Sequence, residues 1–255
     1  MSPPIRRLLT LGIVIGLAIG IWTQRSLLVA SVQHVPQLGL VAGLSEQVAE
    51  GWRVAQGLEL PWPSPRAVAV LGMGASAIGG DLVRGIWGDR ITVPVEVLRG
   101  YELPAWVGPD TLVIASSKSG NTEETLRQLE TALSRRCPVV CVTTGGALGT
   151  VAQAAGLPLA VFPDIGAPRT SLGWSLGILT GVLQRAGVLE IDAAEIEAGT
   201  ASGQAMDDRC APSVPSSDNP AKHLDWSLVD RIAVISGAGF LAPIARRWKT
   251  QFNEN

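Results

Sequence analysis

The sequence has little charge, and the two signs nearly balance. Of its 255 residues, 16% are charged, and the formal net charge is −2. With no basic excess, the composition argues against nucleic acid as a partner, so any recognition of phosphate must be local and made by a shaped pocket. Apolar residues make up 47% of the chain. A chain of this length can therefore bury a sizeable core, in one large domain or two modest ones.

Cysteine and histidine are also scarce. The three cysteines, Cys137, Cys141 and Cys210, are too few and too scattered for a disulfide framework. Cys141 lies inside the apolar run Pro138-Val-Val-Cys-Val142, so we expect small core residues in a reducing compartment. Neither histidine has a partner at the spacing of metal ligands, and we predict no metal site.

A long apolar run occurs only near the N-terminus. Leu8 to Trp22 is apolar apart from one threonine and is preceded by Arg6-Arg7, but it is shorter than the ~20 residues that span a bilayer. A positively charged N-terminal segment followed by an apolar stretch is typical of a signal peptide or a membrane anchor, although no clear small-x-small cleavage site follows. The alternative is an extension, residues 1–34, ahead of a folded domain. We expect a cytoplasmic protein, with an N-terminally membrane-anchored one as the alternative.

From Val35 onward, short β-branched runs alternate with longer amphipathic segments. Strands separated by helix-length segments predict right-handed βαβ units, and hence an α/β fold with a doubly wound parallel sheet and helices on both faces. Pro94 places its strand near an edge. The expected strands are 67–71, 93–97, 111–115, 139–143 and 157–162, and the expected helices are 35–56, 77–87, 122–135, 147–155 and 171–184.

A boundary is expected after this first domain, residues 35–199. Residues 200–220 are rich in Gly, Ser, Asp and Pro, which is typical of a linker. In residues 221–255, the run 231–239 predicts a strand that meets a glycine turn, followed by a helix. This would be the first βα unit of a second lobe, and one such unit cannot cover its own sheet edge. We therefore expect a fragment, or a tail that packs on the first lobe or on a partner.

A glycine turn follows the first predicted strand, in Leu71-Gly-Met-Gly-Ala-Ser-Ala77. Its Gly72, Gly74 and Ala77 fit the loose spacing of a dinucleotide site, with Glu96 about 20 residues further on. Glycines let the backbone approach an anion, and the helix that follows supplies N–H groups. A tight turn that binds no ligand is the other interpretation, so this stretch alone leaves the function open.

A run of hydroxyls follows the third predicted strand, in Ser116-Ser-Lys-Ser-Gly-Asn-Thr122. Ser117, Ser119 and Thr122 surround Gly120 at the carboxyl end of a parallel strand, where doubly wound sheets bind ligands. Hydroxyls can donate to anionic oxygens, and the start of a helix offers further N–H groups. One Ser or Thr could simply cap the helix, but three hydroxyls around a glycine favour an anion site.

These motifs resemble those of sugar isomerase (SIS) domains. The resemblance rests on residues 72–80, on Ser-Lys-Ser-Gly-Asn-Thr-Glu-Glu-Thr at 117–125, and on Ala-Pro-Arg at 167–169. Asn-Pro-Ala-Lys at 219–222 and Arg-Trp-Lys-Thr-Gln-Phe-Asn-Glu-Asn at 247–255 make it specific to one branch, the bifunctional phosphoglucose/phosphomannose isomerases. It covers roughly residues 35 to 255, that is, the family's first SIS lobe and the start of its second.

The resemblance implies an isomerase that interconverts glucose 6-phosphate, and mannose 6-phosphate, with fructose 6-phosphate through an enediolate, in glycolysis and gluconeogenesis. It also implies a homodimer, a phosphorylated hexose substrate and no cofactor. The implied roles are catalysis by Glu254 and Arg169, phosphate binding by Ser117, Ser119 and Thr122, and further substrate contacts by Gly74, Ala75 and Ser76.

The sequence departs from the family pattern at Ala75, where glycine is usual, and at Lys118, where tyrosine is frequent. The family's ring-opening histidine and a later catalytic lysine lie beyond Asn255, so the resemblance implies a C-terminally truncated chain with weak or no isomerase activity. Two alternatives remain open. One is an SIS module that senses a sugar phosphate without turnover, and the other is an NAD-dependent oxidoreductase that uses the turn at Gly72.

Overall fold

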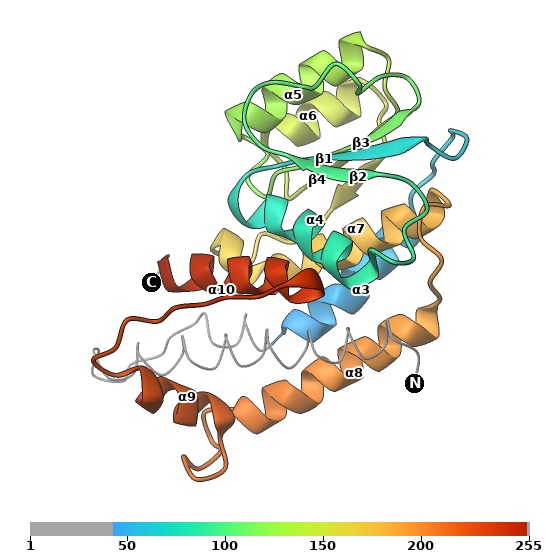
Figure 1. Ribbon diagram of the computed structural model, residues 1–255. Coiled ribbons are helices and arrows are strands. Elements are labelled where there is room, and N and C mark those ends of the chain that lie inside the picture. Colours follow the sequence, from blue (N-terminus) through green and yellow to red (C-terminus); the bar gives the residue numbers. More distant parts are fainter. Residues whose placement is uncertain (1–42, 254–255) are drawn as a thin grey trace. The chain divides into compact units, whose positions relative to one another are not determined.

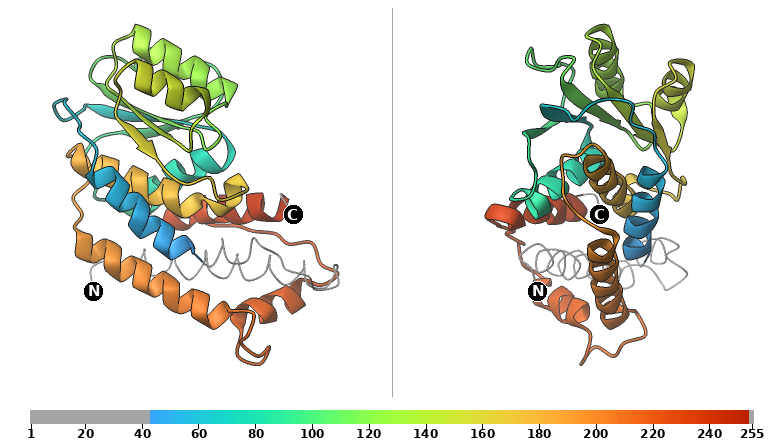
Figure 2. Two further views of the ribbon diagram at one scale, coloured as in Figure 1. Left: turned by 180° about the vertical axis from the view of Figure 1, so that it is seen from behind. Right: turned by 90° about the vertical axis from the view of Figure 1, so that its right-hand side faces the viewer.

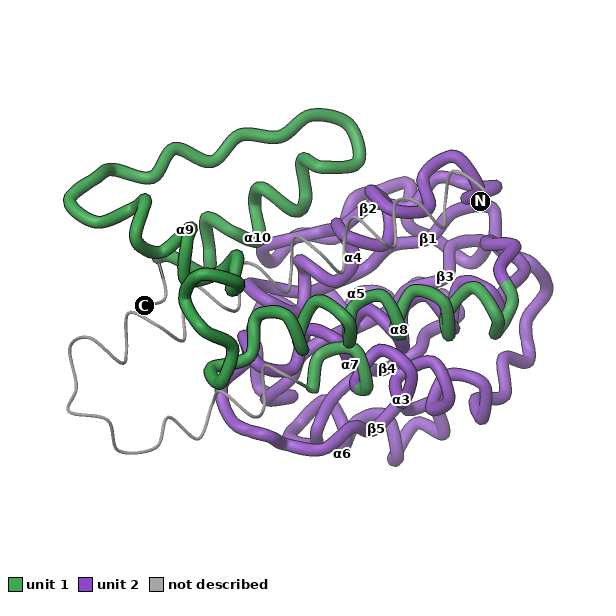
Figure 3. Tube along the Cα trace, turned by 90° about the horizontal axis from the view of Figure 1, so that it is seen from below, with its two compact units in different colours: residues 1–46, 192–255 green, residues 47–191 purple. Residues whose placement is uncertain are grey.

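The computed structural model describes residues 43–253, which divide into two compact units (Figure 1). One unit comprises residues 47–191, and the other includes residues 192–253 together with the residues before Gln47 (Figure 3). The candidate site lies in the unit 47–191. The domain boundaries expected at residues 34, 199 and 220 remain predictions.

A five-stranded parallel sheet forms the centre of the unit 47–191. Its strand order is β2-β1-β3-β4-β5. The three inner strands are buried nearly throughout, so they are continuous runs of mostly apolar residues, as parallel strands covered on both faces require. The strand after Pro94 is at an edge, as predicted. The strands are β1 (Ala67–Leu71), β2 (Val95–Leu98), β3 (Thr111–Ser116), β4 (Val139–Thr143) and β5 (Leu159–Val161).

Helices cover both faces of this sheet (Figures 1 and 2). On one face are α5 (Glu123–Ser134) and α6 (Gly146–Ala154), which pack on a core that includes Leu71, Val113 and Cys141. On the other face are α4 (Gly74–Trp87), α7 (Leu172–Arg185) and the part of α3 (Leu44–Gln56) from Gln47 onward. At Gly177 a Cβ would stand 2.2 Å from the carbonyl oxygen of Val48, so glycine is required where α7 meets α3. The predicted doubly wound fold is confirmed.

The other unit is helical in its described residues. It contains α8 (Ala193–Cys210), α9 (Pro220–Leu228) and α10 (Ala242–Asn253). Asp192 caps α8 by accepting a hydrogen bond from the N–H of Glu195 at 2.9 Å. Asn219 caps α9 by accepting from the N–H groups of Ala221 and Lys222, and Pro220 follows at the first helical position. Part of the Asn-Pro-Ala-Lys motif is therefore a helix start.

Two predictions for this unit differ from the structure. Residues 200–210, expected to begin a linker, belong to α8. In the expected second βα unit the helix is present as α10, but the strand over 231–236 is not formed. A strand needs a neighbour for its backbone hydrogen bonds, and most side chains of this segment face solvent, with Ile232 93% and Val234 88% exposed.

Two other predictions fall on residues that the structure does not describe. The apolar stretch Leu8 to Trp22 and Glu254, the expected catalytic base, both lie outside residues 43–253. Within 43–253, none of the helices combines the length and the hydropathy needed to cross a membrane.

Candidate functional site

The strand order changes direction between β1 and β3. β1 leads through α4 to β2 on one side, whereas β3 leads through α5 to β4 on the other. The loops after β1 and β3 leave the carboxyl edge of the sheet side by side, because the two strands pair in register from Ala67–Thr111 to Leu71–Ala115. This is the position at which doubly wound sheets with the order 2-1-3-4-5 bind ligands. It holds two of the predicted groups, the glycine turn and the hydroxyl run.

The hydroxyl run after β3, residues 117–122, is closed by its own hydrogen bonds. The Ser117 Oγ lies 2.8 Å from the Thr122 Oγ1 and accepts the N–H of Gly120 at 3.1 Å. The Ser119 Oγ accepts the N–H of Asn121 at 3.2 Å. Ser117 is buried, Thr122 is half-buried and Ser119 is exposed. The three hydroxyls thus extend from the buried base of the loop to its surface.

Thr122 is the N-cap residue of α5, and its extended backbone marks where the helix begins. Its side chain makes no hydrogen bond to the first turn of the helix. It is bonded to Ser117 instead, so Thr122 does not act as an ordinary helix cap here. The side chains of Glu123 and Glu124 follow in the first turn, where negative charge is favourable.

Gly120 allows the loop to turn this tightly. Its φ of +68° is in the left-handed region, and a Cβ there would stand 1.9 Å from the carbonyl oxygen of Gly145. Both the backbone conformation and the available space therefore require glycine.

The loop after β4, residues 143–146, holds the hydroxyl loop from one side. The carbonyl oxygen of Lys118 accepts from the Thr144 N–H at 3.1 Å and the Thr144 Oγ1 at 2.8 Å. The Asn121 Oδ1 accepts the N–H of Ala147 at 3.0 Å. The sequence analysis did not predict these hydrogen bonds. The feature that could have indicated them is a second run of hydroxyls and glycines, Thr-Thr-Gly-Gly, at the end of a buried strand.

The glycine turn after β1 approaches the hydroxyl loop from the other side. The Ser76 Oγ accepts the N–H of Lys118 at 3.3 Å, so the structure brings Ser76 beside the predicted phosphate-binding residues. Gly74 has a φ of +49° and begins α4, and Ala75 lies inside that helix. Because Ala75 is helical, its Cβ causes no strain in place of the family's glycine.

Arg169 lies on the segment that follows β5, in the same unit. It is in a 3₁₀ turn, Pro168–Thr170, that packs against α4 and α7. The turn is fixed by Thr170, whose Oγ1 donates to the Ala167 carbonyl oxygen at 2.8 Å and whose own carbonyl oxygen accepts from the Gln47 Nε2 at 2.9 Å. Arg169 is half-buried and comes from the segment that leaves the carboxyl end of β5.

Comparison with known proteins supports the motif-based resemblance. Residues 217–255 match the family described as bacterial phospho-glucose isomerase C-terminal SIS domain. The bifunctional phosphoglucose/phosphomannose isomerase of Caldicellulosiruptor bescii is 36% identical over 218 residues, which cover 84% of this chain and 64% of that protein. The enzyme of the same description from Thermoplasma volcanium is 32% identical over 188 residues, covering 74% and 56%.

By sequence, the chain is similar to bifunctional phosphoglucose/phosphomannose isomerases over most of its length. It spans between 56% and 64% of the length of these two curated relatives. The solved structure of tagatose-6-phosphate ketose/aldose isomerase from Escherichia coli superposes with a TM-score of 0.54 at 16% identity, over 83% of this chain and 61% of that one. This likeness shows that the fold is that of the SIS domains.

The dinucleotide alternative gains nothing from this structure. Glu96, the residue expected to bind a ribose, has its Oε2 3.4 Å from the Arg84 Nη1 on α4. The Ser76 hydroxyl, in the first turn of α4, accepts the Lys118 N–H of the hydroxyl loop instead.

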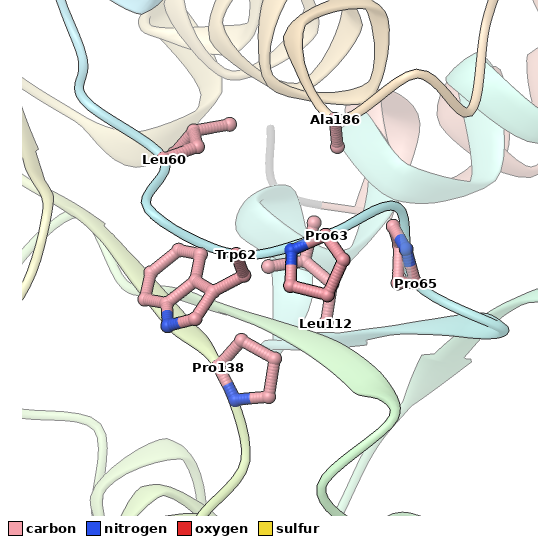
Figure 4. A pocket seen from close by; sticks show the side chains of 7 residues that line it. All are labelled: Leu60, Trp62, Pro63, Pro65, Leu112, Pro138 and Ala186. Carbon is pink, nitrogen blue, oxygen red and sulfur yellow. The ribbon is translucent and has the colours of Figure 1, made fainter.

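An apolar pocket lies at the opposite edge of the sheet (Figure 4). Leu112 near the start of β3 and Pro138 just before β4 line it, together with Trp62 and Pro63. Its lining residues carry no charge and no hydroxyl. A phosphorylated sugar needs donors for its anionic group, so this pocket is not a candidate for the substrate site.

The described cysteines and acidic groups do not form another reactive centre. Burial raises the pKa of the Cys141 thiol to about 12, which keeps it protonated and unreactive. Among residues 43–253 there is no cluster of three or more His, Cys, Asp or Glu side chains that could hold a metal ion.

Proposed function

We propose that this chain contributes the sugar-phosphate-binding lobe of an aldose–ketose isomerase, which interconverts glucose 6-phosphate and mannose 6-phosphate with fructose 6-phosphate. The observation that carries the proposal is the group of hydroxyls at Ser117, Ser119 and Thr122, at the point where the strand order changes direction. The sequence similarity to bifunctional phosphoglucose/phosphomannose isomerases supports the same reaction class.

In this proposal the 6-phosphate binds to the hydroxyl loop. The three hydroxyls and the N–H groups at the start of α5 donate to its oxygens, and Ser76 with Gly74 and Ala75 contacts the sugar. The loop is held in shape before the substrate arrives by its hydrogen bonds to Thr144 and Ala147. The loop therefore loses little conformational entropy when the phosphate binds.

The chemical step requires a base and a cation. A carboxylate, assigned to Glu254, removes the proton from C2 of the open-chain aldose and returns it to C1, while a proton moves between O1 and O2. The Arg169 guanidinium stabilises the negative charge on the enediolate oxygen. The aldose is thereby converted to the ketose, and the protein returns to its starting protonation state without a redox cofactor.

Phosphate binding is tested by Ser117→Ala combined with Thr122→Ala in the protein translated from the whole open reading frame. Loss of two hydrogen bonds to a charged group should raise the KM for fructose 6-phosphate by on the order of 100-fold, with a smaller change in kcat, because a phosphate far from the reacting carbons is bound alike in ground and transition states. The matched control is Thr131→Ala with Ser134→Ala in the last turns of α5, which should leave KM unchanged. An unchanged KM in the first variant would remove the hydroxyl loop from the phosphate site.

The role of Glu254 is tested in the protein translated from the whole open reading frame. Glu254→Gln should abolish turnover of glucose 6-phosphate while calorimetry still detects binding, because only the proton transfer is lost. If the unaltered protein binds the sugar phosphates and isomerises none of them, the sensing module replaces the isomerase as the proposed function.

A further inference from the structure

Lys118 lies in the middle of the hydroxyl loop, between Ser117 and Ser119. It is the one charged residue in the segment 117–122. Its backbone is held on both sides, because its N–H donates to the Ser76 Oγ and its carbonyl oxygen accepts from Thr144. The lysine side chain therefore starts from a fixed point beside all the groups that are assigned to the phosphate.

The ammonium group of Lys118 forms an ion pair with the Asp164 carboxylate, from the segment that follows β5. The two partners are unequally covered: the lysine side chain is 13% exposed and the aspartate side chain 67%. A largely covered cation requires a nearby anion, whereas an exposed carboxylate is well solvated without a cation. The ion pair thus offsets mainly the cost of burying Lys118, and the ammonium hydrogen bond lowers the pKa of Asp164.

A bound sugar phosphate would change the balance of charge around Lys118. A phosphate monoester carries between about −1.5 and −2 charges at pH 7. The residues that directly follow the loop, Glu123 and Glu124, are negative. At equal distance a dianion attracts an ammonium group about twice as strongly as a carboxylate does. The four-carbon stem and three rotatable N–H donors of lysine allow it to change partner.

We infer that Lys118 is a further phosphate-binding residue of this chain, and that its ammonium group exchanges Asp164 for the phosphate of the substrate. This inference rests on the proposed function. Asp164 is then an internal competitor that occupies the cation while the site is empty. Specificity for a phosphorylated over an unphosphorylated sugar comes in part from this exchange.

Two substitutions distinguish the exchange from a purely structural ion pair, because the two models predict different directions of change in the dissociation constant. If the pair only braced two loops, removing either partner would break the same contact and weaken phosphate binding in both cases. If Asp164 competes with the phosphate, removing Lys118 weakens binding and removing Asp164 strengthens it. The two variants then change the dissociation constant in opposite directions.

The experiment is calorimetric titration of the whole chain with glucose 6-phosphate and with inorganic phosphate, at fixed ionic strength. Lys118→Met should raise both dissociation constants about 10-fold or more. Asp164→Asn should lower them by up to about 5-fold. Arg66→Met and Asp110→Asn are matched controls, because these exposed residues lie before β1 and β3, at the opposite edge of the sheet. They change the net charge equally and should leave both constants unaltered.

Each outcome decides the inference. Changes of the same sign in Lys118→Met and Asp164→Asn, or no change in Lys118→Met, would overturn it while leaving the proposed function in place, provided that Ser117→Ala with Thr122→Ala still weakens binding. No binding of either ligand by the unaltered chain would reject both ideas. If Lys118→Met does not fold, Asp164→Asn decides alone, and an equal or higher dissociation constant overturns the exchange.

Discussion

At the scale of single residues, the hydroxyl loop depends on backbone conformation as much as on side chains. Gly120 combines a left-handed φ with contact to the loop after β4. Gly156, after α6, has nearly the same φ of +62°, but nothing lies within 4 Å of where its Cβ would be. Substitutions at the two glycines therefore separate the free-energy cost of a left-handed backbone from the cost of steric overlap.

Gly156→Ala should reduce the free energy of unfolding by about 1 kcal/mol, the cost of a left-handed conformation for a residue with a Cβ. Gly120→Ala should cost about 3 kcal/mol or more, because its Cβ would also collide with a backbone oxygen. It should also weaken phosphate binding. Urea denaturation of both variants measures the difference, and equal losses would show that the contact with Gly145 is not tight.

At the scale of secondary-structure elements, the sheet and its helices could be predicted from local sequence. The predicted strands over 67–71 and 139–143 coincide with β1 and β4, because a strand buried on both faces is an apolar run with clear ends. The positions of Ser117 and Thr122 follow from the end of β3. The bracing by Thr144 and the partner of Lys118 could not be predicted, because both depend on how loops from different strands meet.

The elements after residue 191 were harder to predict for two physical reasons. α8 is rich in Ala, Gly, Ser and Thr and has no marked apolar face, so its composition resembles that of a linker. Its one clear signal was Asp192 with Glu195 three residues later, a helix-start pattern. The segment 231–236 has the composition of a strand, but strand formation depends on a neighbour that local sequence does not specify.

Asp207 on α8, near the first turn of α3, has an unusual pKa. Gly203 lies so close to Ser45 that a Cβ would stand 2.3 Å from the Ser45 Oγ. One turn later, Asp207 is largely buried, and burial, with the charge of Asp208 as a second cause, raises its pKa to about 7.

This raised pKa predicts that the protein loses stability between about pH 4 and pH 7. In that range the folded state keeps the proton that the unfolded state has released, so the free energy of unfolding falls as the pH rises, and levels off above the folded pKa. Asp207→Asn should flatten this part of the profile and stabilise the protein at pH 8. Asp218→Asn, at an exposed position, is the control. A wild-type slope that survives in Asp207→Asn would assign the effect to another group.

At the scale of the whole molecule, the balance of charge gives little long-range attraction for an anionic substrate. With a net charge of −2, the proposed phosphate binding must depend on the donors of one loop and not on the field of the protein. The family resemblance implies that such lobes act as homodimers, and this remains a prediction for the present chain.

Sedimentation equilibrium tests the predicted dimer. A homodimer has twice the chain mass of 26.7 kDa, and the fitted mass should approach that value as concentration is raised through the micromolar range, as mass action requires. A fitted mass of one chain throughout that concentration range would contradict the prediction.

The contacts between the loops after β3 and β4 have a consequence for protein engineering. Gly146 could not carry a Cβ without meeting the Ser119 carbonyl oxygen at 2.3 Å, and the Gly120 carbonyl oxygen accepts the N–H of Leu148 at 2.9 Å. The conformation of residues 117–122 thus depends on packing and hydrogen bonds with residues 143–148. Grafting residues 117–122 alone onto another parallel-sheet scaffold should yield a loop without a fixed conformation that does not bind phosphate. A successful graft must also include residues 143–148.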